Sequence, residues 1–92
     1  MPRIELTPHL RRYFPSLPEA PFPLEGRTVA EVVHALDRRW PGLRGYIVDD
    51  RGALRRHVNI FVGPARVKDR DALSDGVAED GEVFILQALS GG

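Results

Sequence analysis

Apolar side chains recur at helical spacing in one stretch of the chain, residues 28–40. On a helix they would form one continuous stripe, made of Val29, Val32, Val33, Leu36 and Trp40. Thr28 precedes the stripe as a typical N-cap, and Glu31 follows three residues later, which completes a capping box. Pro41 and Gly42 end the pattern, because proline cannot continue a helix and glycine accepts a left-handed exit. The sequence therefore predicts one amphipathic helix of about three turns.

Strand-like segments flank this helix on both sides. Before it lie residues 3–7 and a short edge strand near residues 22–25, separated by a loop that four prolines keep out of any ladder. After it lie residues 57–63, a short strand near residues 66–67, and a last strand at residues 82–89. The last strand is apolar on both faces, which predicts a central place in the sheet.

The order of these elements indicates an α+β fold. One helix packed across a mixed sheet of four to five strands can bury its apolar stripe on the inner face of the sheet. A first hairpin, a crossover helix and a central last strand are typical of the β-grasp, the ubiquitin-like arrangement. We expect a single β-grasp domain over residues 1–89, followed by a flexible diglycine tail at residues 90–92.

Composition narrows the classes of function. The chain has 92 residues, of which 42% are apolar, enough for one modest core. Its 13 basic and 13 acidic residues cancel, which argues against nucleic acid or an anionic membrane as the main partner. The absence of cysteine excludes disulfides, thiolate metal sites and cysteine nucleophiles. No apolar run approaches the length of a membrane span, so a cytoplasmic protein is expected.

Candidate enzymatic groups are sparse. The three histidines, His9, His34 and His57, fall on separate predicted elements without metal-binding spacing, so no metal site is expected. The acidic pairs at 49–50 and 79–80 occur in turn-like sequence, where turn formation and solvation explain them. There is no recognisable nucleophile–base pair or nucleotide loop. We therefore expect a protein that is not an enzyme and binds no cofactor.

Two glycines, Gly91 and Gly92, follow the apolar last strand. Glycine loses the most backbone entropy on ordering, so this pair contributes nothing to a fold. A terminal pair arises by chance in about 0.5% of chains at the usual glycine content of roughly 7%. Glycine suits a terminus that must enter a narrow channel of another protein, since no Cβ obstructs its passage. The pair is thus a candidate functional element.

Three segments, taken in order, resemble the small bacterial sulfur-carrier proteins of the MoaD/ThiS type. The first is the helix segment, from Gly26-Arg27-Thr28-Val29 through Pro41-Gly42-Leu43. The second is Leu54-Arg55-Arg56-His57-Val58-Asn59-Ile60-Phe61-Val62, and the third runs from Asp80-Gly81-Glu82-Val83 to Gly91-Gly92. This family includes the small subunit of molybdopterin synthase, the thiamine sulfur carrier and a carrier of cysteine synthesis. The resemblance covers residues 24–92.

The resemblance implies a cycle of activation and sulfur transfer. An E1-like enzyme would use ATP to adenylate Gly92, and a sulfur source would convert the adenylate to a C-terminal thiocarboxylate. A sulfur-accepting biosynthetic enzyme would then take the sulfur. In this scheme Gly92 is the reactive residue, Gly91 is a spacer, and Leu89 with Ser90 begins the tail. The product could belong to molybdopterin, thiamine or cysteine biosynthesis.

A carrier of this kind needs a docking surface. The strand residues expected to face the helix are Val58, Ile60, Val62, Val83 and Ile85. If this set faces the helix, then Phe61, Phe84 and Leu86 lie on the opposite face of the sheet, where clustered apolar side chains mark interfaces. With Leu89 and Ser90 they are the predicted partner-binding residues. Alternatively, the proline-rich loop covers this face, or the strand phase differs by one residue.

Two other functions fit the same features. A ubiquitin-like modifier would be joined through Gly92 to a lysine of a target protein. Lys68 is the single lysine, so such a modifier could hardly build chains on itself. A plain β-grasp interaction domain, in which the glycines are incidental, is the third possibility. Extending the chain beyond Gly92 would inactivate a carrier or a modifier and leave an interaction domain unaffected.

Overall fold

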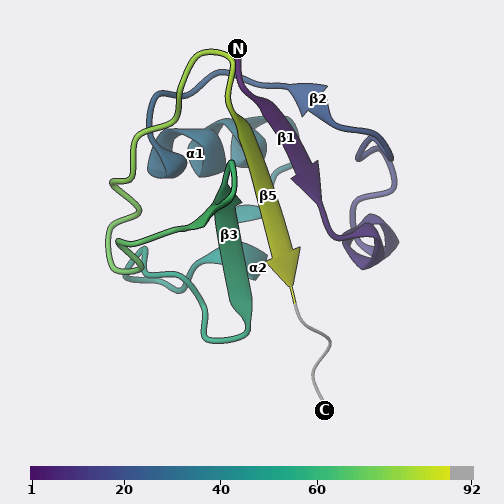
Figure 1. Cartoon of the computed structure of the whole chain (residues 1–92). Coiled ribbons are helices and arrows are strands. Elements are labelled where there is room, and N and C mark those ends of the chain that lie inside the picture. The colour runs from purple at the N-terminus through teal and green to yellow at the C-terminus, as the bar shows by residue number, and fades with distance from the viewer. Residues whose placement is uncertain (88–92) are drawn as a thin grey trace.

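A computed structural model of the chain describes residues 1–87, and it contains a five-stranded sheet with one main helix packed across it (Figure 1). The helices are a 3-10 helix, η1 (Pro8–Arg12), and two α-helices, α1 (Val29–Arg39) and α2 (Arg44–Ile47). The strands are β1 (Arg3–Leu6), β2 (Phe22–Pro23), β3 (Val58–Val62), β4 (Ala65–Arg66) and β5 (Glu82–Gln87). The predicted strands are confirmed, with ends that differ by one or two residues, while the end predicted for the last strand, at residues 88–89, lies outside the described residues.

The sheet has the strand order β2-β1-β5-β3-β4. β5 pairs in parallel with β1 and antiparallel with β3, while β2 and β4 form the antiparallel edges. The first and last strands of the chain thus lie side by side at the centre (Figure 1). The predicted central place of the last strand is confirmed, and this topology is the β-grasp.

Local chemistry sets both ends of α1. At its start, the Thr28 hydroxyl accepts a hydrogen bond from the backbone N–H of Glu31 at 3.2 Å. The Glu31 carboxylate reaches back to the N–H of Arg27 at 2.9 Å, one residue earlier than a standard capping box requires. At its end, the Asp37 carboxylate accepts from the N–H of Gly42, which has a left-handed φ of 98°. The predicted helix limits are therefore confirmed.

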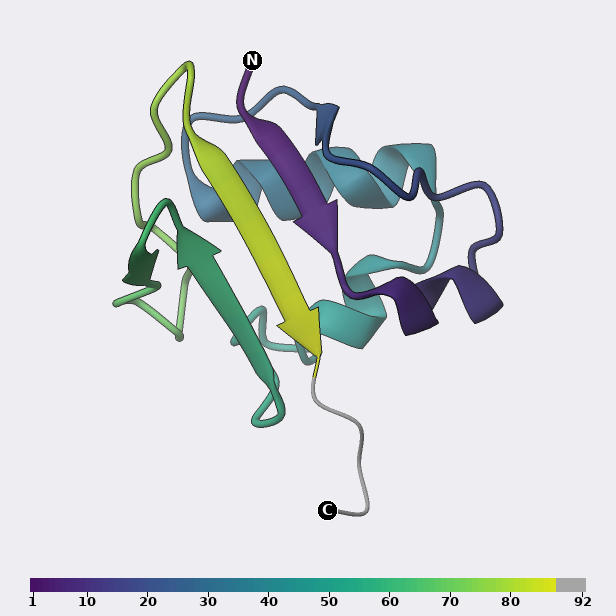
Figure 2. The same cartoon turned by 45° about the vertical axis from the view of Figure 1, so that its right-hand side comes forward.

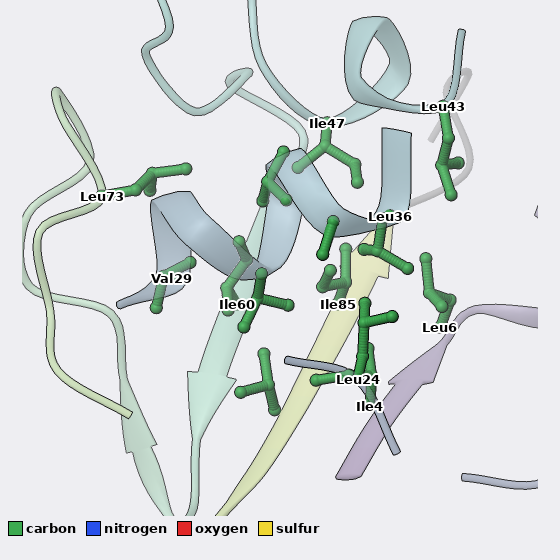
Figure 3. Packing of buried hydrophobic residues seen from close by; sticks show 14 of the residues in the cluster. Ile4, Leu6, Leu24, Val29, Leu36, Leu43, Ile47, Ile60, Leu73 and Ile85 are labelled. Carbon is green, nitrogen blue, oxygen red and sulfur yellow. The ribbon is translucent and has the colours of Figure 1, made fainter. Parts of the chain in front are cut away.

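α1 lies across one face of the sheet (Figure 2), and its apolar stripe forms one layer of the core. All five predicted stripe residues are buried, and Ala35 joins them. Figure 3 shows Val29 and Leu36 beside Ile60 and Ile85 of the sheet. Burying one such side chain stabilises a fold by about 1.5–3 kcal/mol, so this layer contributes substantially to the stability of the domain.

Two features were absent from the sequence analysis. Arg44–Ile47 forms the short helix α2, which buries Ile47 beside α1. The loop at residues 67–77 docks on the start of α1, where the carbonyls of Leu73 and Asp75 accept hydrogen bonds from the N–H groups of Ala30 and Val29. Both features depend on contacts between distant residues. Within residues 1–87, no helix is long and apolar enough to cross a membrane.

Candidate functional site

The last described residue of the chain, Gln87, ends the central strand of the sheet. It is the ladder partner of Val58 on β3. The predicted site residues Leu89, Ser90, Gly91 and Gly92 lie outside the described residues. The structure therefore describes the last strand as far as Gln87, and the roles given to these four residues stay predictions.

The three other predicted site residues lie on the face of the sheet opposite α1. Phe61 and Phe84 are ladder partners on β3 and β5, and Leu86 lies opposite Asn59. The alternate residues Ile60, Val83 and Ile85 are buried, so the strand phase deduced from the sequence is correct. Phe61 and Phe84 are half-buried, and Leu86 is 36% exposed. We name Phe61, Phe84 and Leu86 the apolar patch.

Charged residues border this patch on the neighbouring strands. Glu5 on β1 is the ladder partner of Phe84, and the Arg66 guanidinium lies 5.8 Å from the centre of the Phe61 ring. Such a cation over an aromatic face contributes about 0.5–1 kcal/mol at an exposed site. Arg3, on β1 beside Glu82, donates to the carbonyl of Pro21 at 3.1 Å. The patch thus has an apolar centre and a polar rim, as interfaces commonly do.

The proline-rich loop reaches one end of the patch. Pro21 lines a hollow of about 230 Å³ together with Glu5, Gly63, Glu82, Val83 and Phe84. Of the three patch residues, only Phe84 lines this hollow. Phe61, directly opposite Phe84 on β3, and Leu86, two residues farther along β5, do not line it. The loop therefore borders the patch at Phe84, while Phe61 stays half-buried and Leu86 exposed.

Histidines gather where β5 ends, which the sequence analysis missed. The Gln87 carboxamide contacts His9 of η1 through its Oε1, at 2.9 Å, and His57 through its Nε2, at 3.2 Å. His34 lies apart from them, on the exposed side of α1. No cluster of metal-ligating side chains occurs among residues 1–87. A sequence gives no signal for such a convergence, since His9 and Gln87 are separated by 78 positions.

The acidic residues of the turns hold the backbone in place. The Asp69 carboxylate accepts hydrogen bonds from the hydroxyl and N–H of Ser74 and from the N–H of Ala72, which lower its pKa to about 2. The N–H groups of Arg51 and Ala53 likewise lower the pKa of Asp49. Hydrogen bonds to a charged carboxylate favour its ionised form. These acids are turn-forming groups, as the sequence indicated for residues 49–50.

Solved structures with the same fold span the whole chain. A chain of the Amycolatopsis orientalis BexX/CysO complex matches with a TM-score of 0.83 and 24% identity, over 100% of both chains. Mycobacterium tuberculosis CysO matches with a TM-score of 0.81 and 24% identity, over 97% of this chain and 100% of that one. The small archaeal modifier protein 1 of Methanosarcina acetivorans matches with a TM-score of 0.73 and 24% identity, over 98% and 94%.

Comparison by sequence gave no match, in contrast to comparison of structures. No protein-family model matches the chain, and no curated protein matches it significantly. At 24% identity these comparisons show a shared fold, and a shared fold does not by itself establish a shared function. The chain has the same fold as CysO and the small archaeal modifier protein 1, which is the β-grasp fold that the resemblance seen in the sequence implies.

Proposed function

We propose that this chain is a sulfur carrier protein that works through the carboxylate of Gly92. The observation that carries the proposal is the full-length likeness of the fold to CysO, combined with the diglycine that follows the central strand. The fold supplies a rigid body, and the glycines supply a reactive group that no side chain obstructs. In this role the chain is a protein co-substrate of other enzymes, without a cofactor of its own.

Activation follows from the chemistry of carboxylates. A carboxylate resists nucleophilic attack until one of its oxygens becomes a leaving group. An E1-like enzyme would let the Gly92 carboxylate attack the α-phosphorus of ATP, releasing pyrophosphate and forming an acyl-adenylate. A sulfur nucleophile would then displace AMP and leave a thiocarboxylate, which a biosynthetic enzyme would use as its sulfur source.

The apolar patch is the proposed docking surface for the activating enzyme. Protein interfaces commonly have aromatic side chains at the centre and polar or charged residues at the rim, and the patch has both. The patch shares β5 with Gln87, so a partner bound there would lie beside the strand from which the predicted tail continues. That CysO occurs in a complex with BexX supports a partner protein for this fold.

Conjugation to proteins is the second candidate, favoured by the likeness to the small archaeal modifier protein 1. It shares the fold, the activation step and the reactive Gly92. The two functions differ in the nucleophile that attacks the activated Gly92. It is a sulfur source for a carrier and a lysine of a target protein for a modifier. The single lysine, Lys68, leaves almost no site for chains of the protein on itself.

Intact mass measurement tests the proposal directly. The chain is incubated with an E1-like ATPase of known activity, ATP and sulfide, and its mass is recorded. Replacement of one oxygen by sulfur, absent after deletion of Gly92, is the expected result. Covalent adducts with larger proteins would indicate the modifier instead. An unchanged mass together with the absence of adducts would refute both functions.

A further inference from the structure

The end of β5 is held by contacts from three other parts of the chain. The Gln87 N–H donates to the Thr7 hydroxyl at 2.9 Å, just beyond β1. The Gln87 side chain contacts His9 on η1 and His57 in the segment that leads into β3. Figure 2 shows η1 and the start of β3 on either side of the end of β5. We name His9, Gln87 and His57 the histidine bracket.

The bracket makes use of both ends of the carboxamide. Its Oε1 can only accept a hydrogen bond and its Nε2 can only donate. In the orientation that the structure gives the carboxamide, Oε1 lies 2.9 Å from the Nε2 of His9, and Nε2 lies 3.2 Å from the Nε2 of His57. This arrangement requires an Nε2–H on His9 as donor and a bare Nε2 on His57 as acceptor. The two rings would then have opposite hydrogen-bonding roles, which gives this arrangement a specific chemical signature.

Hydrogen bonds of Thr7 also connect the end of β1 to β5 beside the bracket. Thr7 donates its hydroxyl to the carbonyl of Ile85 at 3.1 Å, and its own N–H bonds the same carbonyl at 3.1 Å. Gln87 is half-buried and has its backbone N–H, Oε1 and Nε2 all engaged. A strand end normally frays, because it lacks ladder contacts beyond its last pair. Here side chains from both neighbouring sides, those of Thr7, His9 and His57, contact Gln87 directly.

We propose that Gln87 is a positioning residue: its carboxamide, held between His9 and His57, fixes the direction in which the chain leaves the sheet. This inference rests on the proposed function, in which the Gly92 carboxylate must reach the α-phosphate of ATP in a partner. Holding reacting groups in one geometry lowers the activation barrier, and a misdirected chain spends less time in that geometry. The bracket therefore acts on the chemical step, while the apolar patch acts on docking.

Two variants of equal side-chain length test this role. Gln87→Met keeps the length and removes both hydrogen bonds. Gln87→Glu keeps the length and offers two acceptor oxygens, so that each histidine can donate its Nε2–H. We expect Gln87→Met to lower the kcat of thiocarboxylate formation about five- to tenfold with KM unchanged, since two hydrogen bonds of modest strength are lost. Gln87→Glu should retain the kcat of the parent protein.

Controls separate positioning from general damage. His34→Gln removes an exposed histidine outside the bracket and should leave both kinetic constants unchanged. Melting temperatures of both Gln87 variants equal to that of the parent protein would show that the fold is intact in both. If Gln87→Met matches the parent protein in kcat, or if Gln87→Glu falls as far as Gln87→Met, the positioning role is refuted.

A spectroscopic measurement decides the question even if no thiocarboxylate forms. At about pH 8, where histidine side chains are ordinarily neutral, long-range nitrogen–proton NMR spectra report the tautomer of each ring. We expect a protonated Nε2 in His9 and a bare Nε2 in His57, with His34 as the reference for an exposed ring. In Gln87→Glu, the Nε2 of His57 should become protonated.

The same samples report on the residues that follow the bracket. Heteronuclear NOE values of the amides after Gln87 should fall in Gln87→Met and stay unchanged in Gln87→Glu. If His9 and His57 show the tautomer mixture of His34, or if these NOE values are equal in all variants, the proposal is refuted. Failure of the proposed function alone would appear differently, as a normal NMR signature without any gain of sulfur.

Discussion

The two faces of β5 have opposite surroundings although their residues alternate along one strand. Val83 and Ile85 are 1% and 0% exposed under α1, whereas Phe84 and Leu86 remain accessible on the other face. Both sets are apolar, so hydrophobicity alone does not distinguish them. The difference is whether another element of the chain covers them. Apolar side chains that the fold leaves uncovered are available to a partner.

Paired alanine substitutions at neighbouring positions should give the largest contrast. Ile85→Ala removes a fully buried side chain and should lower the free energy of unfolding by about 2–5 kcal/mol, because a cavity remains. Leu86→Ala, on the accessible face, should lower it by less than about 1 kcal/mol. Urea denaturation at neutral pH measures both. Equal losses would mean that the two faces contribute equally to stability.

A smaller loss is expected where the chain passes close to α1 on the covered side. A Cβ at Gly26 would lie 2.6 Å from Cγ2 of Val32 and 2.9 Å from its backbone nitrogen, and φ is 152°. Gly26→Ala should therefore cost about 1–3 kcal/mol in the free energy of unfolding. Gly45→Ala is the control, since its Cβ would have no neighbour within 4 Å. A control as destabilised as Gly26→Ala would contradict this explanation.

The accessible face should matter for the partner more than for the fold. Phe84→Ala removes an aromatic ring of the apolar patch, and we expect KM for activation by the E1-like enzyme to rise about tenfold with kcat unchanged. Tyr13→Ala removes an aromatic ring that is 56% exposed and lies outside the patch, so it should leave KM unchanged. Steady-state kinetics of pyrophosphate release measures both. A normal KM for Phe84→Ala would remove the patch from the docking surface.

The smallest effect at neutral pH concerns the loop that covers the start of α1. The pKa of Asp69 is lowered from 3.8 to about 2 by hydrogen bonds within this loop. A carboxylate with a lowered pKa stabilises the folded state above its unfolded pKa, and this contribution is lost as the pH falls from about 4 towards 2. Asp69→Asn should therefore show a shallower loss of stability over that range. Urea midpoints at several pH values test it, and an unchanged acid slope would refute it.

Periodic segments were predictable because their information is local. The stripe from Val29 to Trp40, its cap at Thr28 and the stop at Pro41 determine α1 within a single run of sequence. The strand phase assumed for residues 57–63 and 82–89 placed Phe61 and Phe84 correctly on the face of the sheet opposite α1. Elements whose stability comes from their own amphipathic pattern can be deduced without knowing the rest of the fold.

Non-periodic segments were not predictable for the opposite reason. α2 has four residues, too few for a helical period, and forms because Ile47 is buried beside α1. Leu73 adopts a left-handed φ of 56°, unusual for leucine, in a loop that buries its side chain and uses its carbonyl to cap α1. In both cases a tertiary contact outweighs the local preference of the backbone.

The sequence by itself determined the main helix, the central strand, the two faces of the sheet and the diglycine that carries the proposed chemistry. Only the tertiary structure decided that His9 and His57, 48 positions apart in the chain, meet on either side of Gln87. The physical reason is that periodic burial is encoded in neighbouring residues, whereas a hydrogen-bonded convergence depends on the path of the whole chain. The histidine bracket exists because β1, β3 and β5 lie side by side.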